Sequence, residues 1–452
     1  MKRLSLSALV AAGVLAGMTG ANAADLGGNC CADLEERIAE LEATTARKGN
    51  RKVSLTISGW VTQQVAIWDD GVRTKAYVSD AGTTLASHVT LSGQAQINTD
   101  WSAGYVMHIE AVGNDPLGYS QTASDAGFGR PAKTVNVFQS FWFVKSNTIG
   151  KLSIGLQSSA GDNVAIYPDG SGSLVPANYV LFDNNSFFLR TTATKQLSGQ
   201  TWGNYGTCPK IQTGVVADCD GVPNNNIRYD TPTFGGFSAS ASWGEADIWD
   251  IAGRYAGEFN GVKLAAAIAY TESTDGAAET DAANGKLLVR RGGQAVQIGA
   301  YIEHVPTGLF VYGAYGKDFN GDLQSAGERA AFGNKTDGDN FYLKAGARIK
   351  HNSLGHTVLF AEYGENNDKQ SLALFQSGVT GSSLTQWGLG VVQEIDAAAM
   401  SVWFMYRNFS LDQNCNAVNT NTECAASLGA GKAGKTTFED FSVFKLGGLI
   451  NF

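Results

Sequence analysis

The sequence predicts an all-β fold, a transmembrane antiparallel β-barrel of 16 strands. Three observations lead to this prediction. Segments throughout the chain alternate apolar and polar residues with the period of two that strands require. Short turns alternate with long polar loops, and the last segment, from Phe444 to the terminal Phe452, ends on an aromatic residue of an apolar face. An outer-membrane barrel shows all three features, because its outer face contacts lipid and its inner face contacts water.

The first 23 residues have the pattern of a secretory signal peptide. Lys2 and Arg3 precede an apolar stretch over 4–18, and Ala21–Ala23 supplies a small-residue cleavage site. A retained membrane anchor is disfavoured, because the apolar stretch is short and interrupted. Without Lys2 and Arg3, 31 basic and 42 acidic residues remain, a formal charge of −11. No basic tail or patch indicates a nucleic-acid partner.

A periplasmic segment over 24–50 is expected to precede the barrel, which covers 51–452. Within this segment, residues 31–46 predict a helix, because Leu34, Ile38 and Leu41 fall at heptad-like spacing. Isolated helices of this length are marginally stable in water. The helix is therefore either a small coiled-coil stub between subunits or a frayed linker.

Alternation of apolar and polar residues marks the wall strands, which lie near 53–68, 87–98, 104–111, 134–146, 150–159, 226–232, 236–244, 249–259, 261–271, 295–305, 308–317, 340–350, 355–364, 384–395, 398–410 and 437–452. An even number of strands suits a barrel with both ends in the periplasm. The longest connection, 161–225, follows the fifth strand and is therefore the third outer loop. A hairpin within 179–195 would raise the strand count to eighteen, and this alternative stays open.

Four of the six cysteines form two pairs that are local in sequence. Cys208 and Cys219 lie in one loop, and Cys415 and Cys424 lie in another, which predicts two disulfides in an oxidising compartment. Cys30 and Cys31 are adjacent and poorly placed to pair with each other, so they either bridge subunits or stay reduced. Neither loop pair has a nearby histidine, and we expect no metal site and no cofactor.

Strand alternation also places charged side chains on the inner face of the barrel. A charge at mid-membrane on the lipid face would cost a few kcal/mol, so inward placement is strongly favoured. The residues assigned to the inner face in this way include Arg254, Lys344, Arg348, Arg407, Lys445, Glu110 and His108.

Several phrases of the sequence resemble the general porins of alphaproteobacteria. They are VSLTISGWVTQQV, NNIRYDTPTFGGFSASASWGE and RYAGEFNGVKLAAAIAY, together with the signal peptide, the short helix and the terminal aromatic residue. The resemblance covers nearly the whole chain. It implies a homotrimer of 16-stranded barrels in the outer membrane of a Gram-negative bacterium, in contact with lipid and lipopolysaccharide. It also implies passive diffusion of ions and small hydrophilic solutes.

In proteins that look like this one, the third loop folds into the lumen and forms a constriction between acidic loop residues and basic wall residues. The resemblance therefore makes Asp162, Asp169 and Asp183 candidates for the acidic side. Opposed charges of this kind create a transverse field across the pore. Phe452 resembles the signal that barrel-assembly machinery reads. The candidates for the basic side are Arg254, Lys344, Arg348 and Arg407.

The expected mature N-terminus, Ala24–Asp25, is similar to the pair through which barrels of the same bacterial class are tied covalently to peptidoglycan. The alternative is a simple signal-peptidase scar. The mature charge predicts weak cation preference, although selectivity follows the lumen charges rather than the total charge.

Three rival functions differ from general diffusion. A substrate-specific channel would use an aromatic slide, for which Trp60, Trp68 and Trp142 are candidates. An enzyme would use His88 and His108, but no nucleophile motif accompanies them, and we expect no enzymatic activity. An adhesin or structural barrel would have a plugged lumen.

Overall fold

The computed structural model describes residues 52–124, 134–180, 183–208, 211, 218–280, 287–291, 293–319, 337–371, 373–374, 377–417, 421–429 and 431–452. The predictions for the signal peptide 1–23, the helix 31–46, Ala24–Asp25, Cys30 and Cys31 lie outside these residues. So does Lys210. Within the described part of the chain, no helix is both long and apolar enough to cross a membrane.

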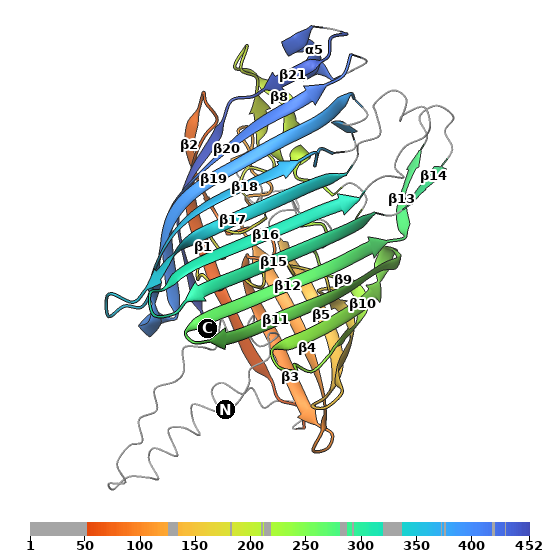
Figure 1. Cartoon of the computed structure of the whole chain (residues 1–452), viewed down its shortest axis with the longest axis vertical. Helices are drawn as coiled ribbons and strands as arrows, with labels where there is room; N and C mark the ends of the chain where they lie inside the picture. The colour runs from red at the N-terminus through yellow and green to blue at the C-terminus, as the bar shows by residue number, and fades with distance from the viewer. Residues whose placement is uncertain are drawn as a thin grey trace.

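One antiparallel sheet closes on itself to form the barrel (Figure 1). Its strands are β1 (Thr56–Asp69), β2 (Thr74–Ser79), β3 (Ser87–Gln96), β4 (Trp101–Val112), β5 (Thr134–Ser146), β6 (Gly150–Gln157), β9 (Asn224–Asp230), β10 (Phe237–Gly244), β11 (Ile248–Phe259), β12 (Val262–Ser273), β15 (Gln294–His304), β16 (Leu309–Phe319), β17 (Gly338–Ile349), β18 (Thr357–Asn367), β19 (Val379–Ile395), β20 (Met400–Cys415), β21 (Gly434–Thr437) and β22 (Phe441–Asn451).

These eighteen labelled strands make sixteen wall strands, which confirms the predicted count. β2 and β3 pair with successive parts of β1, so together they occupy one position in the wall. β21 and β22 pair in the same way with successive parts of β20. The segment 179–195 adds no wall strand, because β7 (Phe188–Arg190) pairs only with β8 (Leu197–Thr201) in a separate small sheet.

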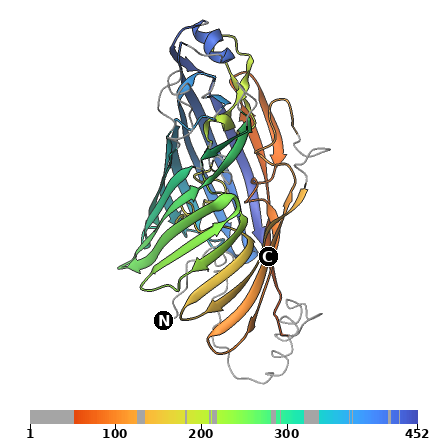
Figure 2. The same cartoon turned by 90° about the vertical axis from the view of Figure 1, so that its right-hand side faces the viewer.

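The wall closes where the first strand meets the last. β1 and β22 pair from Trp60↔Asn451 to Asp69↔Ser442. Phe452 continues this pairing, because its N–H donates to the Gly59 carbonyl at 3.0 Å and its carbonyl accepts from the Gly59 N–H at 3.1 Å. Figure 2 shows the C-terminus on this seam, where the blue strand lies beside the orange one. Closure leaves no open sheet edge, as a membrane barrel requires.

The two faces of the wall differ as the alternation predicts. Large apolar side chains such as Val61, Leu343 and Phe404 are exposed on the outer face, at 56%, 47% and 50%. Trp142 is also on the outer face, 50% exposed, and so is excluded from an inward aromatic slide. A bulge in β5 between Val137 and Gln139 explains this position, because it shifts the outward residues from odd to even numbers.

The two ends of the barrel differ in their connections. One end has short turns, such as Asn260–Gly261 between β11 and β12, where both residues have positive φ. The other end carries the long connections, including the hairpin of β13 (Asp275–Thr280) and β14 (Leu287–Arg291), which stands out from the rim in Figure 1. The remaining short elements are α5 (Thr422–Leu428), η1 (Trp202–Tyr205), η2 (Glu245–Asp247) and η3 (Asp396–Ala398).

Candidate functional site: the barrel lumen and its folded-in loop

The connection from β6 to β9, which the structure describes over 158–180, 183–208, 211 and 218–223, lies mainly against the inner face of the wall. Its first part packs on β11 and β12, where Ala160 and Val164 form a small buried cluster with Ala252, Ala267 and Ala269. Small wall residues are needed here because the loop backbone approaches the sheet closely. The guanidinium of Arg254 donates to the Ala160 carbonyl at 2.7 Å, which fixes this approach.

The second part of the loop, residues 165–180, covers the inner faces of β15 to β20. The Tyr312 hydroxyl donates to the Ala165 carbonyl at 2.6 Å, and Tyr179 packs in the same cluster as Tyr342. Lys344 on β17 donates to Asp169 at 2.6 Å and to the Ala177 carbonyl at 2.8 Å. The side chains of Lys344 and Asp169 are 0% and 1% exposed, so this ion pair is fully enclosed.

The third part of the loop is anchored by Asp183. Its carboxylate accepts from Arg407 on β20 at 2.6 Å and from Lys445 on β22 at 2.7 Å. Arg407 also donates twice to Glu362 on β18, at 2.6 and 2.9 Å. Burial alone would raise the pKa of Asp183, but the charges of Lys445 and Arg407 outweigh it and hold this pKa below its usual value. Two cations and two carboxylates therefore balance beneath the loop.

An aromatic cluster covers the region of β1, β2, β20 and β22 nearest the long loops. Loop residues Phe187, Trp202 and Tyr205 pack there with wall residues such as Trp68 and Phe441. Trp68 is 1% exposed, so it lies inside but within a packed core rather than along an open passage. Arg190 adds an ion pair with Asp70, at 2.8 Å.

The return part of the loop carries a disulfide between Cys208 and Cys219. Lys369, which is fully buried, donates to Asp318 at 2.7 Å and lies 3.2 Å from the Cys208 sulfur. The second predicted disulfide, Cys415–Cys424, joins the end of β20 to α5. Both local pairings predicted from the sequence are therefore present.

A group of buried acids lies where the loop leaves and rejoins the wall. Asp162 is 1% exposed, and Asp218 and Asp220 are fully buried. Burial, followed by the charge of Asp218, raises the pKa of Asp162 to about 8. Burial also raises the pKa of Asp218 and, together with the charge of Asp250, raises the pKa of Asp220 well above its usual value. At neutral pH Asp162 is therefore mostly protonated.

These contacts change the predicted picture of opposed charges across water. Asp169 and Asp183 contact Lys344 and Arg407 directly, and all four side chains lie beneath the loop. Ion pairs that are in contact and buried neutralise each other instead of sustaining a field across an aqueous gap. The other two candidates on the basic side keep some exposure: Arg254 is half-buried, and Arg348, paired with Glu394 at 2.7 Å, is 25% exposed.

The loop leaves the inner faces of β3 to β6 and of β9 uncovered over much of their length. Inward residues such as Thr90, Gln139 and Phe141 remain half-buried, and Gln94 and Gln96 are exposed. Their counterparts on β15 to β20, for example Tyr312 and Met405, are fully buried. Space for water and solutes along the wall therefore lies on this side.

Three basic side chains line the uncovered side on neighbouring strands, and Arg254 on β11 is close enough for its charge to act on one of them; strand alternation could have located all of these except Lys145, which follows the bulge in β5. Asp230 accompanies them: it accepts from Arg228 at 2.7 Å and lies 3.3 Å from Lys151. The Lys151 side chain is 27% exposed, that of Arg228 is 15% exposed, and Lys145 is exposed. The four basic residues are Lys145, Lys151, Arg228 and Arg254.

His108 and Glu110 lie on the uncovered inner wall, on β4. Lys445, the third inward residue predicted outside the constriction, is 4% exposed and contacts Asp183 and the Pro176 carbonyl. It therefore contacts the loop rather than open space.

A family model described as Gram-negative porin matches residues 6–426. No curated protein sequence matches the chain. Among solved structures, the chain is similar to an anion-selective porin from Comamonas acidovorans, with 16% identity, TM-score 0.53 and coverage of 88% of this chain and 100% of that one. It is also similar to Salmonella typhi OmpF, with 14% identity, TM-score 0.50 and coverage of 89% and 99%. The trimer form of Vibrio cholerae OmpT matches with 12% identity, TM-score 0.50 and coverage of 88% and 99%.

Proposed function

Because the chain belongs to the Gram-negative porin family, we propose that it is a general diffusion pore of the alphaproteobacterial type. The barrel lies in the outer membrane and forms a water-filled diffusion channel. What supports general diffusion is the uncovered inner wall of β3 to β6 and β9, where polar side chains such as Thr90, Gln94, Gln96 and Gln139 remain accessible beside Phe141. Of the three tryptophans that were candidates for an aromatic slide, Trp142 lies on the outer face and Trp68 lies in a packed core, so neither lines the passage.

The passage runs between this uncovered wall and the folded-in loop. Arg254 and Arg348 line it, while Asp169, Asp183, Lys344 and Arg407 hold the loop in place beneath its surface. Asp162 lies at the base of the loop, where it is buried and mainly protonated. The width of the narrowest part of the passage therefore depends on how firmly these ion pairs hold the loop against the wall.

The charge of the passage favours anions. Lys145, Lys151, Arg228 and Arg254 face it, with Asp230 beside Arg228 and Lys151 and the half-buried Asp100 near Lys145. This proposal differs from the cation preference expected from the net charge of the sequence, because selectivity depends on the charges that permeating ions meet.

A planar-bilayer recording tests both the general pore and its selectivity. We expect a steady conductance with no saturable block by sugars, and a reversal potential in a KCl gradient that favours chloride. Lys151→Glu is expected to shift the permeability ratio toward potassium by several-fold, because it reverses a charge on the passage wall. Saturable sugar block would contradict general diffusion, and a wild-type reversal potential favouring potassium would contradict the proposed selectivity.

The assembly is proposed to be a homotrimer, as in the trimer form of Vibrio cholerae OmpT. The same bilayer recording then shows closure in three equal steps. Lipid and lipopolysaccharide surround the apolar outer face, and barrel-assembly machinery reads the strand that ends at Phe452. No enzymatic activity is proposed.

A covalent link to peptidoglycan through Ala24–Asp25 completes the proposal for the N-terminus. It rests on the signal peptide 1–23 being removed, so that Ala24 becomes the first residue. Peptidoglycan digested with lysozyme is expected to release a muropeptide that carries this N-terminal peptide, and its absence by mass spectrometry would contradict the link.

A further inference from the structure

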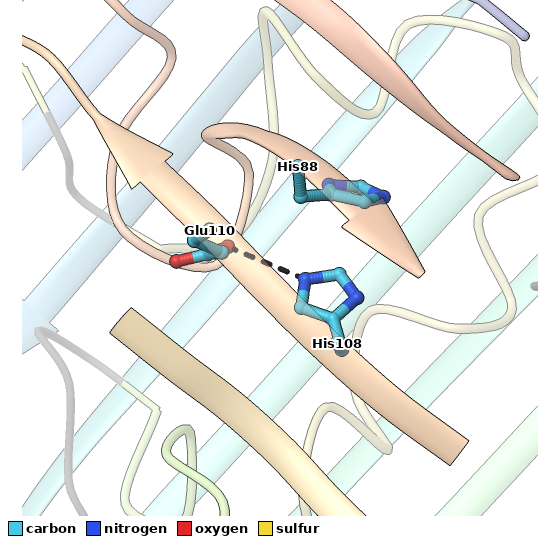
Figure 3. A group of neighbouring side chains, drawn as sticks. All are labelled: His88, His108 and Glu110. Atoms are coloured by element: carbon cyan, nitrogen blue, oxygen red, sulfur yellow. Dashed lines mark ion pairs between the residues drawn. The ribbon is translucent and has the colours of Figure 1, made fainter. Parts of the chain in front are cut away.

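Two histidines and a glutamate converge on the uncovered inner wall. His88 lies on β3, and His108 and Glu110 lie on β4 (Figure 3). The two strands pair with His88 opposite Glu110 and Thr90 opposite His108. His108 and Glu110 are two residues apart on one strand, so they share a face. We propose that these three residues bind a first-row transition-metal cation such as Zn²⁺.

The ligand atoms are close enough for one ion. One potential ligand atom from each residue lies within 4.8 Å of the other two. His108 Nε2 is 3.9 Å from Glu110 Oε1, and the two imidazole rings are 4.2 Å apart between centroids. Zinc–nitrogen and zinc–oxygen bonds of about 2.0–2.2 Å place neighbouring ligands roughly 3.3 Å apart in a tetrahedron. The two imidazoles are closer together than two rings bound to one ion, so the histidine side chains must turn apart to reach that geometry.

The atoms that would bind the metal have no other partner among the described residues. His108 Nε2 and Glu110 Oε1 are both buried without a hydrogen bond. The Glu110 side chain is 0% exposed, and its other oxygen accepts only a long bond, 3.3 Å, from the Thr84 N–H. Leaving a carboxylate oxygen buried and unpartnered is costly, and such groups are rare. A bound cation would satisfy both atoms at once.

The Nδ1 atom of each imidazole has a partner of its own, which leaves Nε2 as the nitrogen available to a metal. His88 Nδ1 lies 3.1 Å from the Ala86 carbonyl, which can only accept, so this nitrogen carries the proton and Nε2 has the free lone pair. His108 Nδ1 lies 2.8 Å from the Thr90 hydroxyl. Second partners of this kind fix the ring and its tautomer in metal sites. The Trp60 ring, edge-on to His88 at 4.1 Å, further restricts the imidazole.

The donor set selects the class of metal. Two imidazoles and one carboxylate suit zinc, copper(II) or nickel(II), whereas calcium and magnesium prefer oxygen ligands alone. Three protein ligands leave a fourth position for water, and His88 is half-buried rather than enclosed, so solvent reaches the site. The cysteines of the two loops form disulfides, as predicted, whereas this site, which the sequence did not predict, comes from two wall strands.

A bound ion would act on the passage, and this consequence rests on the proposed function. The site lies on the wall along which solutes are proposed to pass. A divalent cation there adds positive charge at short range, so it would increase the preference for anions and lower the potassium current.

The test is direct zinc binding to the full-length barrel, purified without a histidine tag and assembled in detergent. The chain carries Cys30→Ser and Cys31→Ser, so that these thiols cannot bind zinc. Calorimetry is expected to give one Zn²⁺ per chain, and Co²⁺ is expected to give the visible absorption of a four- or five-coordinate nitrogen–oxygen site. His88→Gln and His108→Gln are each expected to abolish binding at concentrations that saturate the parent. Thr90→Val is expected to weaken binding about tenfold, as loss of a second-sphere partner does.

His351→Gln is the matched control, because His351 is exposed and far in sequence from the site. It is expected to leave affinity and stoichiometry unchanged. Parent-like zinc binding by the His88→Gln/His108→Gln double variant, or no binding by the parent at millimolar Zn²⁺, would overturn the proposal. If the His108→Gln barrel does not assemble, zinc binding by the His88→Gln barrel decides the test. A barrel that conducts ions but binds no zinc overturns the metal site alone, and one that binds zinc but conducts nothing overturns the channel proposal alone.

Discussion

At the scale of single residues, the lumen contains acids in two opposite electrostatic situations. Asp183 is buried between two cations and is held ionised, whereas Asp162 is buried beside other acids and is held protonated. Both residues belong to the same loop and look alike in the sequence. The difference comes from partners that the fold brings from distant strands, since Arg407 is 224 positions from Asp183.

Asp162 makes the attachment of the loop sensitive to pH. Its pKa in the folded barrel is about 8, raised by burial and by Asp218 from a value of 3.8. Between these values the folded state holds a proton that the opened state releases, so the stabilisation is complete below pH 4 and is lost as the pH rises through 8. The equilibrium for opening the loop is expected to increase by up to about tenfold per pH unit from pH 5 to 8.

Hydrogen exchange of peptides from 158–180 at pH 5 to 9 measures this opening. The variant Asp162→Asn serves as the control, because an amide has the same shape but does not titrate in this range. It is expected to flatten the pH dependence, with any remaining slope due to Asp218 and Asp220. An equal slope in parent and variant would show that Asp162 is not the titrating group.

At the scale of elements, the folded-in loop is held by packed apolar clusters and by ion pairs that bind it to three wall strands, β17, β20 and β22. Asp183 contributes the most, because it joins β20 and β22 and is linked through Arg407 to Glu362 on β18. Removing one partner of a buried ionic pair typically costs about 3–5 kcal/mol, because it leaves an uncompensated charge. Asp183→Asn is therefore expected to release the third part of the loop while the wall itself stays closed.

Limited proteolysis of the assembled barrel measures this release. Cleavage within 183–205 is expected to become at least tenfold faster in Asp183→Asn, with increased current noise in bilayers. Asp396→Asn is the control, since its pair with Lys350 is 53–55% exposed and exposed pairs contribute roughly 0–1 kcal/mol. Equal cleavage rates in the two variants would contradict an anchoring role for Asp183.

The wall was predictable from the sequence, and the loop was not. Alternation identified all sixteen wall strands because one side of each meets lipid, a local constraint that every strand obeys. It failed at Trp142, where a bulge at Phe138 shifts the parity without any mark in the sequence. The course of the loop depends on contacts such as Lys344 with Asp169, which are 175 positions apart, and no local pattern encodes them. Charge type could suggest such pairs but could not show that they are buried.

At the scale of the whole molecule, the barrel depends on a seam that joins its first and last strands. Phe452 makes two backbone hydrogen bonds with Gly59, and its ring lies over that glycine, where an added Cβ would come within 3.0 Å of the ring and 2.1 Å of the His88 carbonyl. Glycine at 59 is therefore required by this close approach. The backbone bonds do not depend on the aromatic ring, so closure of the seam and recognition of the ring are separable.

Phe452→Ala separates these two roles. The backbone pairing with Gly59 remains, so we expect refolding in detergent, followed by heat-modified mobility in gels, to be close to the parent. If barrel-assembly machinery reads the terminal ring, the amount of assembled protein in the outer membrane is expected to fall several-fold in cells. Phe444→Ala is the control, because Phe444 lies outward on the same strand with 42% exposure against 54% for Phe452. Equal cellular assembly of the two variants would contradict a signal in the terminal ring, whereas a refolding defect confined to Phe452→Ala would show that the ring instead stabilises the seam.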